Sequence, residues 1–340
     1  SKYMEDSLAF DITSPVTILG LYGAWDGIVK MIKDARVNSL HNNISTDSRT
    51  FLKDSYVGDA LSLCFIGPLI ACLVIDVVIG NKELRDCCIP FDLLNMEFGY
   101  GHKSDATNFK SEKKQEIHSK LSDKKVLIIG AGGLGSPAAI ALTMAGIGTL
   151  GIVDSDHVEI SNLNRQVLHT TSRLNLPKAN SAKIFLNKIN PSIRIIPYNL
   201  RVNRKNIRDV LKNFDVVIGA VDNLATRYLV NDACHFMKKP YLEAGIQGFY
   251  GIATSFIDTE GPCYRCIFPE NTNTSQTQPA TKGVLGPVPG VMGFIEAAEC
   301  IKTLTNIGTP LQNRLVIFDA SEMTFNSATY KKSSCLICGK

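Results

Sequence analysis

The segment around residue 130 constrains the fold of this chain most. An apolar run, Lys125-Val-Leu-Ile-Ile129, leads directly into Gly130-Ala-Gly-Gly-Leu-Gly135, and small and apolar residues continue to Ala145. A strand, a glycine-rich turn and a helix in this order form a phosphate-binding turn, because glycine lets the backbone approach a ligand and the helix start offers free N–H groups. The pattern alone also fits an NAD-dependent dehydrogenase, or a tight turn without a ligand.

Strands and helices alternate after this turn, which predicts an α/β fold with a Rossmann-like, doubly wound, mostly parallel sheet. The expected helices are Ser136–Ala145, Lys178–Ile189 and Gly290–Thr305. The expected strands are Lys125–Ile129, Thr149–Val153, Arg194–Pro197, Asp215–Gly219, Pro240–Ala244 and Arg314–Phe318, with an antiparallel extension beginning at Gly251–Ile257. The segment Glu270–Lys282 is rich in Asn, Thr, Gln and Pro, and is expected to be a mobile loop.

Composition excludes several classes of protein. A hydrophobic content of 45% and a charged content of 20% predict a globular core. The net charge of +4 comes without a dense Lys/Arg block, so nucleic acid is not an expected partner. The segment Ser1–Asp11 does not look like a secretory signal, and the ten cysteines form no disulfide framework, which favours the cytoplasm. Ala60–Gly80 is long enough to span a membrane, but Gly67-Pro68 and Asp76 favour a buried strand, turn and helix.

Polar side chains follow the expected strand ends. Asp154 comes directly after Val153, where it can bind a ribose hydroxyl. Arg165 lies in the polar stretch that follows, Lys178 opens a helix, and Asp222 follows the strand at Asp215–Gly219. We expect these last three side chains to converge on phosphates, because cations stabilise charge on phosphorus under attack and a carboxylate can hold Mg²⁺.

Two cysteine pairs, Cys263-x-x-Cys266 and Cys335-x-x-Cys338, stand far apart in the chain. Four thiolates form a closed tetrahedral set, which is typical of structural zinc. The metal would hold the C-terminal segment against the sheet extension. A redox-active disulfide is the alternative interpretation.

With these residues in place, the sequence from about 120 to 340 resembles the ThiF/MoeB/HesA family, relatives of ubiquitin-activating enzymes. The resemblance rests on Gly130–Gly135, on Asn162-Leu-Asn-Arg-Gln166, on Gly261-Pro-Cys-Tyr-Arg-Cys266 and on Gly283–Gly290. It implies an adenylyltransferase in which a polypeptide carboxylate attacks the α-phosphate of ATP and gives an acyl-adenylate and pyrophosphate.

The resemblance also implies the roles of individual residues. Arg165 and Lys178 would act on the phosphates and Asp222 would bind Mg²⁺, which makes these three the expected catalytic residues. The residues expected at the nucleotide are Gly130, Gly132, Gly133, Gly135, Asp154, Asp156, Asn162, Arg165, Gln166, Lys178, Asp222 and Asn223. The expected cofactors are ATP, Mg²⁺ and Zn²⁺. The expected zinc ligands are Cys263, Cys266, Cys335 and Cys338. A homodimer is expected, with a peptide or small carrier protein as substrate and no membrane partner.

The sequence departs from the family in two places. Many members carry a cysteine just before the GVxGP segment, but no cysteine lies between Cys266 and Cys300, so a thioester in that loop is not expected. The other cysteines, such as Cys234 and Cys300, are expected in the core. Members usually also have an arginine in an arm before the first strand, whereas no arginine occurs between Arg85 and Arg165. Candidates to replace that arginine are Lys103, Lys110, Lys113, Arg36 and Arg49.

The expected domains are an N-terminal region at 1–105, a linker at 106–123 and the adenylation domain at 124–340. The N-terminal region contains two possible echoes of the second domain. Val16-Thr-Ile-Leu-Gly20 with Leu-Tyr-Gly23 resembles the strand and glycine loop at residue 130, and Phe91-Asp-Leu-Leu-Asn-Met-Glu-Phe98 matches Phe318-Asp-Ala-Ser-Glu-Met-Thr-Phe325. The region is therefore a degenerate half, a separate substrate-binding fold, or similar by chance.

Four functions fit to different degrees. Peptide tailoring, as in the antibiotic pathways of microcin C and pantocin, ranks first, because those relatives need no enzyme thioester and have an added N-terminal region. Activation of a Gly-Gly-ending sulfur carrier for thiamine or molybdopterin synthesis is the alternative. A non-catalytic peptide-binding module ranks lower, because Arg165, Lys178 and Asp222 are all present. A dehydrogenase ranks last, because no proton-transfer residue can be placed.

Overall fold

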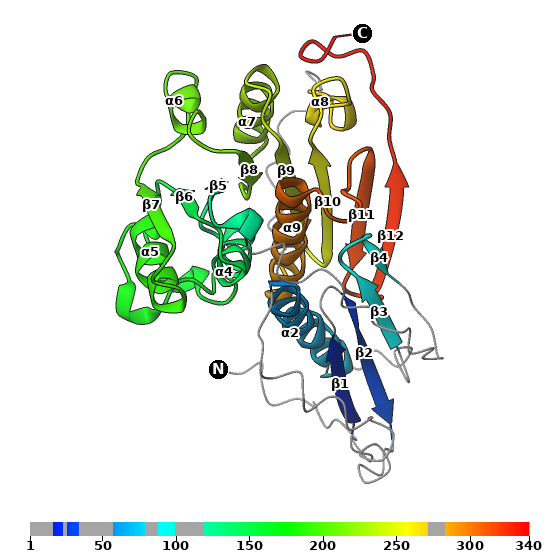
Figure 1. Ribbon diagram of the computed structural model, residues 1–340. Coiled ribbons are helices and arrows are strands. Elements are labelled where there is room, and N and C mark those ends of the chain that lie inside the picture. Colours follow the sequence, from blue (N-terminus) through cyan, green and yellow to red (C-terminus); the bar gives the residue numbers. More distant parts are fainter. Residues whose placement is uncertain are drawn as a thin grey trace.

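The computed structural model describes residues 16–22, 26–33, 57–78, 88–98, 119–270 and 283–339 (Figure 1). The predicted mobile loop lies outside these residues except for Glu270. The candidates for the missing arginine, Lys103, Lys110, Lys113, Arg36 and Arg49, lie outside them as well.

The main sheet has eight strands in the order β12-β11-β10-β9-β8-β5-β6-β7. The strands from β9 to β7 run parallel, and β10, β11 and β12 extend the sheet in antiparallel fashion. Their bounds are β5 Lys125–Ile129, β6 Thr149–Val153, β7 Arg194–Tyr198, β8 Val216–Gly219, β9 Tyr241–Gln247, β10 Tyr250–Phe256, β11 Arg314–Asp319 and β12 Thr324–Thr329. The predicted fold class is confirmed.

Helices cover both faces of the parallel strands, as the alternating side chains of β5 require. Val126 and Ile128 belong to one core, with α4 (Gly135–Ala145), α5 (Lys178–Ile189) and α9 (Pro287–Thr305). Leu127 and Ile129 point to a second core, formed with α6 (Ile207–Leu211) and α7 (Leu224–Phe236). Successive side chains of a strand point to opposite faces, so an all-apolar strand must be covered twice. Cys234 and Cys300 lie in these cores, as predicted.

The N-terminal part forms a separate antiparallel sheet in the order β1-β2-β3-β4. Its strands are β1 Val16–Tyr22, β2 Asp26–Lys33, β3 Cys88–Asp92 and β4 Glu97–Phe98. The predicted echo of the glycine loop at Val16–Gly23 is wrong. The chain does not continue from β1 into a helix but reverses into β2, which pairs with β1 along its whole length.

A single helix, α2 (Val57–Val78), replaces the strand, turn and helix predicted at Ala60–Gly80. It continues through Pro68, although proline removes one N–H donor and crowds the preceding turn. Burial of apolar side chains on both sides of Pro68 offsets this cost, since Phe65, Leu69 and Leu73 are fully buried in the core that includes α4 and α9. Among the helices that the structure describes, none is long and apolar enough to cross a membrane.

The direction in which successive strands are added to the sheet reverses at β5. The chain leaves β5 for β6 and β7 on one side, and β8 and β9 follow on the other. The carboxyl ends of β5, β6 and β8 therefore meet at one edge, with Ile129 opposite both Val153 and Gly219. Ligands of open α/β sheets bind at such a switch point.

Candidate functional site

The glycine loop between β5 and α4 lies at this edge of the sheet, directly after the carboxyl end of β5. Gly130 has a φ of 106°, and a Cβ atom there would lie 2.2 Å from the carbonyl oxygen of Ala220. A Cβ on Gly135 would lie 1.9 Å from the carbonyl oxygen of Gly130. Gly132 and Gly133 have more room, with nearest atoms at 3.6 and 3.2 Å. The outer glycines thus set the turn, and the inner two add no side chain of their own to its outward face, where Gln166 and Arg165 lie.

Asp154 fixes the glycine loop to the end of β6. Its carboxylate accepts a 2.8 Å hydrogen bond from the backbone N–H of Ala131 and another from that of Asp156. Burial raises the pKa of Asp154, although the two backbone donors and nearby Lys178 act in the opposite direction. The structure therefore assigns Asp154 a loop-holding role beside the ribose contact, which stays a prediction.

Lys178 stands at the start of α5, directly after Pro177. Its side chain is buried, and its Nζ lies 3.2 Å from a carboxylate oxygen of Asp156. The backbone N–H of Lys178 also donates to the carbonyl of Asp156. Asp156 itself is 68% exposed, so solvent reaches the acceptor of this buried ammonium. A phosphate could approach Lys178 from that side, because ammonium groups bind phosphate as point charges.

The segment after Asn162 lies over the inner glycines. Asn162 ends a short 3-10 helix, Ile160–Asn162, and its carbonyl accepts from the N–H of Gln166. The Cγ of Arg165 would lie 3.6 Å from a Cβ on Gly133, and its guanidinium donates to Asn164 at 2.9 Å. Among the described residues, Arg165 has no carboxylate within ion-pair distance. A guanidinium that has neutral acceptors and no carboxylate partner in this part of the structure, next to a phosphate-binding loop, fits a polyphosphate.

Gln166 supplies an acceptor with no partner. Its side chain is 5% exposed, and its Nε2 would lie 3.6 Å from a Cβ on Gly132. Its buried Oε1 has no hydrogen-bond partner within the described part of the chain. Buried polar atoms are normally paired. The orphaned oxygen beside the glycine loop therefore fits a site that a nucleotide completes.

Asp222 and Asn223 lie between β8 and α7. Asn223 caps α7, since its side-chain oxygen accepts a 2.9 Å hydrogen bond from the N–H of Thr226. Asp222 is exposed, and no cation pairs with it among the residues that the structure describes. Carboxylates of this kind bind Mg²⁺ together with substrate phosphates. Asn223 thus has a structural role that the sequence did not assign.

The loop joins the predicted site residues to one another through successive contacts. Gly130 packs against Ala220 next to the Asp222 turn, Ala131 binds Asp154, and Gly132 and Gly133 face Gln166 and Arg165. No direct contact joins Arg165, Lys178 and Asp222 within the described residues. Their convergence on one phosphate stays a prediction.

His169 is a site residue that the sequence analysis missed. Its Nε2 lies 2.8 Å from the carbonyl oxygen of Ala131, and its Nδ1 lies 2.9 Å from the hydroxyl of Ser181. Burial lowers the pKa of His169 to about 4, and Lys178 and Arg173 act in the same direction. The imidazole is therefore neutral at pH 7, and its Nε2–H donates to the loop. In the sequence, only its position three residues after Gln166 indicates that it lies near the site.

Arg227 is a second missed residue. It forms a buried ion pair with Glu243 of β9, and its other terminal nitrogen donates to the carbonyl of Val221 at 2.7 Å. Tyr241 also donates to Glu243, and burial raises the pKa of Glu243 to about 7. This cluster holds the backbone directly before Asp222. The sequence offered no signal for it, because the pair forms only when α7 packs against β9.

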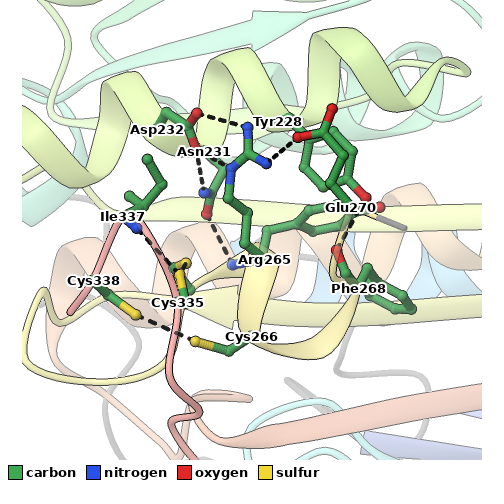
Figure 2. A network of polar contacts seen from close by, with 12 residues as sticks. Tyr228, Asn231, Asp232, Arg265, Cys266, Phe268, Glu270, Cys335, Ile337 and Cys338 are labelled. Atoms are coloured by element: carbon green, nitrogen blue, oxygen red, sulfur yellow. Dashed lines mark hydrogen bonds and ion pairs between the residues drawn. The ribbon is translucent and has the colours of Figure 1, made fainter. Parts of the chain in front are cut away.

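The four predicted metal ligands form one cluster. Figure 2 labels three of them, Cys266, Cys335 and Cys338. Their sulfur atoms all lie within 4.8 Å of one another, with Cys263 and Cys335 at 3.6 Å and Cys266 and Cys338 at 3.3 Å. Four thiolates about 2.3 Å from one zinc ion would lie roughly 3.8 Å apart. All four are free thiols, so the donor set fits zinc better than a disulfide.

Arg265 ties this cysteine cluster to α7. The residue lies between Cys263 and Cys266 in α8 (Tyr264–Ile267). Figure 2 shows its guanidinium between two carboxylates, Asp232 of α7 at 2.8 and 2.9 Å and Glu270 at 2.7 Å. It also lies 4.4 Å from the ring centroid of Tyr228. The cluster therefore joins the C-terminal segment to the helix that follows Asp222.

Comparison with known proteins identifies the family. Residues 103–337 match the ThiF family. The chain belongs to the ThiF family. Its enzyme class is that of the E1-like adenylyltransferases, which confirms the prediction that rests on the glycine loop and on Asn162–Gln166.

Individual ThiF relatives differ in how much of their length this chain covers. The chain is 42% identical over 227 residues to the SAMP-activating enzyme E1 of Haloferax volcanii, which covers 66% of this chain and 84% of that protein. It is 37% identical over 265 residues to the adenylyltransferase and sulfurtransferase MOCS3-1 of Zea mays. That match covers 77% of this chain but 55% of the maize protein, so the chain spans about half of that relative.

Solved structures of the family share the fold. The crystal structure of E. coli MccB with MccA-N7isoASN has a TM-score of 0.59 and 26% sequence identity, and the match covers 66% of this chain and 69% of MccB. The structure of SeMet PaaA, at 20% identity and a TM-score of 0.55, shows the fold alone.

Proposed function

We propose that this chain uses ATP to adenylate the C-terminal carboxylate of a small sulfur-carrier protein. The observation that carries the adenylation step is the assembly around the glycine loop. Within the described residues, Arg165 has no ion pair and the side-chain oxygen of Gln166 has no partner, and both side chains lie beside the inner glycines. The buried ammonium of Lys178 lies next to Asp156, just after β6.

In the proposed step, an oxygen of the carrier carboxylate forms a bond to the α-phosphorus of ATP. The bond from that phosphorus to the bridging oxygen breaks, and pyrophosphate leaves with the electron pair. Arg165, Lys178 and the first N–H groups of α4 stabilise the charge on the phosphates. Asp222 would hold Mg²⁺, which when bound neutralises the charge of the pyrophosphate.

The four cysteines would hold a structural zinc ion. A closed set of four thiolates leaves no open position for a reactant, so the ion contributes to folding and not to the reaction. It would fix Cys335 and Cys338 to α8, and through Arg265 to α7.

The similarity to known proteins favours a carrier over a tailored peptide. From the residues alone, peptide tailoring in antibiotic biosynthesis ranks first, but activation of a sulfur carrier is better supported by the relatives. The identity of 42% to the SAMP-activating enzyme covers 84% of that protein, whereas the identity to MccB is 26%. The missing loop cysteine fits either function, because neither requires a thioester in that loop.

The test is ATP–pyrophosphate exchange with purified protein. We expect exchange with a small carrier ending in Gly-Gly, and none with the same carrier after removal of its last glycine. A short peptide with a C-terminal carboxylate serves as the competing substrate. Exchange with the peptide alone would move the protein to peptide tailoring, and ATP binding without exchange would favour the non-catalytic module.

The variant Arg165→Ala tests whether Arg165 takes part in the adenylation step. Removal of one donor that stabilises the transition state lowers rates by roughly 10²–10³-fold. Arg208→Ala is the matched variant, because Arg208 is an exposed arginine of α6 and should leave exchange unchanged. Equal exchange rates in both variants would contradict the role of Arg165.

A further inference from the structure

The two Phe-Asp-x-x-x-Met-x-Phe segments fold into the same hairpin. Residues 91–98 form β3, a turn and β4, and residues 318–325 form the end of β11, a turn and the start of β12. In each segment the first and last phenylalanines pair across the hairpin. Met96 and Met323 have φ values of 52° and 51°, in the left-handed region that non-glycine residues rarely adopt. In each turn the aspartate accepts a hydrogen bond from the N–H two residues later.

The likeness extends to the neighbouring strands. Gly27 of β2 lies opposite Phe91, and Gly251 of β10 lies opposite Phe318. Strands β1 to β4 and strands β9 to β12 each form an antiparallel series in chain order. In the described part of each connection between the second and third strand there is one long helix, α2 or α9. We name residues 16–98 the N-terminal unit and residues 241–329 the C-terminal unit. Chance similarity does not reproduce strand order, register and an unusual backbone conformation together.

The two units pack against each other through equivalent parts. Phe98 and Phe325, the last phenylalanines of the two hairpins, stack with ring centroids 4.0 Å apart and planes 11° apart. The helices α2 and α9 also meet, and a Cβ on Gly290 would lie 2.8 Å from the ring of Pro68. Figure 1 shows α2 at the end of α9, with the N-terminal sheet beside the antiparallel strands.

Hydrogen bonds to backbone carbonyls close the same interface. The N–H of Thr309 donates to the carbonyl of Leu94 at 2.9 Å, and a terminal nitrogen of Arg314 donates to the carbonyl of Asn95 at 2.8 Å. Apolar residues of α2, β3, α4 and α9 form one continuous core across it. Contact between equivalent elements of two like units is the geometry of a two-fold dimer, where one patch meets its own copy.

We propose that the N-terminal unit is a second copy of the C-terminal unit, which covers α9 and the Phe325 hairpin from within the same chain. It takes the position in which a second copy of this chain would dock. A unit tethered in the same chain has a high effective concentration and excludes a separate partner from that surface. The predicted homodimer therefore does not form through α9.

Neither unit contains the glycine loop. The loop lies at residues 130–135, and residues 1–98 contain no second Gly-x-Gly sequence. Each chain then carries one nucleotide site for its two units, and its α9 surface is complete without a partner. This inference is independent of the proposed substrate.

Engineered disulfides test the inference without reference to enzyme activity. We would combine Phe98→Cys with Phe325→Cys, whose native rings stack, and Asn95→Cys with Thr309→Cys, whose side-chain oxygens lie 3.2 Å apart. The second pair is exposed and spares the core. Mild oxidation should give a disulfide within one chain, seen as faster migration without reductant and as a peptide joining the two segments.

The single-cysteine variants are the controls for background thiols. The disulfide should form with the same yield at low and high protein concentration, because it joins two segments of one chain. A disulfide between two chains would show that the N-terminal unit covers the α9 of a neighbour. No disulfide in either double variant would show that the units do not meet, and either result overturns the proposal.

Discussion

The Nε2 of His169 lies 2.8 Å from the carbonyl oxygen of Ala131, in the middle of the glycine loop. The N–H of the same Ala131 donates to Asp154 at 2.8 Å. The N–H of Ala131 is therefore bonded to the end of β6, and its carbonyl is bonded to His169, which follows the Arg165 segment. The loop is set before any ligand arrives, which reduces the entropic cost of binding.

Replacing His169 should weaken nucleotide binding. His169→Ala removes the donor to Ala131, and one net hydrogen bond contributes about 1 kcal/mol, or roughly fivefold in affinity. His169→Asn can still donate and should recover part of the loss. Isothermal titration with ATP measures both. Unchanged affinity in the alanine variant would show that the loop keeps its shape without this contact.

His169 should also make stability depend on pH. Its pKa falls from 6.5 to about 4 in the folded protein. Between these values the unfolded chain binds the proton and the folded protein does not, so the free energy of unfolding rises with pH. The contribution is present above pH 6.5 and is lost as pH falls toward 4. Urea unfolding across this range should show a shallower slope for His169→Asn than for the wild type, and equal slopes would contradict the assignment.

Two glycines of the loop should differ strongly in how far the same substitution lowers the free energy of unfolding. Gly135→Ala places a Cβ 1.9 Å from the carbonyl of Gly130, and should destabilise the fold by about 3 kcal/mol or more. Gly132→Ala meets nothing nearer than 3.6 Å and should change the free energy of unfolding little. Thermal unfolding without nucleotide compares the pair. Similar losses for both would mean that the turn is not set by its outer glycines.

Removing one thiol should release the metal. Cys338→Ser leaves three thiolates, so bound zinc should fall from about one ion per chain to much less, and the unfolding temperature should drop. Cys234→Ala is the control, since Cys234 is a buried cysteine outside the cluster and its loss should not change zinc content. Elemental analysis of both proteins measures the zinc content per chain. Full zinc occupancy in Cys338→Ser would exclude this cluster as the metal site.

Local sequence predicted the elements of the adenylation domain well. Lys125–Ile129, Thr149–Val153 and Lys178–Ile189 have the expected bounds, because buried parallel strands read as short apolar runs and glycine or proline marks their ends. Local sequence predicts a break at Pro68, where the structure has one continuous helix. Propensity counts proline against a helix, whereas packing on α4 and α9 keeps α2 continuous.

The sequence by itself determined the chemistry that is available, through residue types at fixed short spacings: the glycine loop, the Arg165 segment and the two cysteine pairs. Tertiary structure alone decided which distant residues support that chemistry. His169 reaches Ala131, Arg227 finds Glu243, and Phe98 stacks on Phe325 only after helices pack on strands far along the chain. Such contacts carry no local periodicity, since their free energy arises from burial and pairing between separate elements.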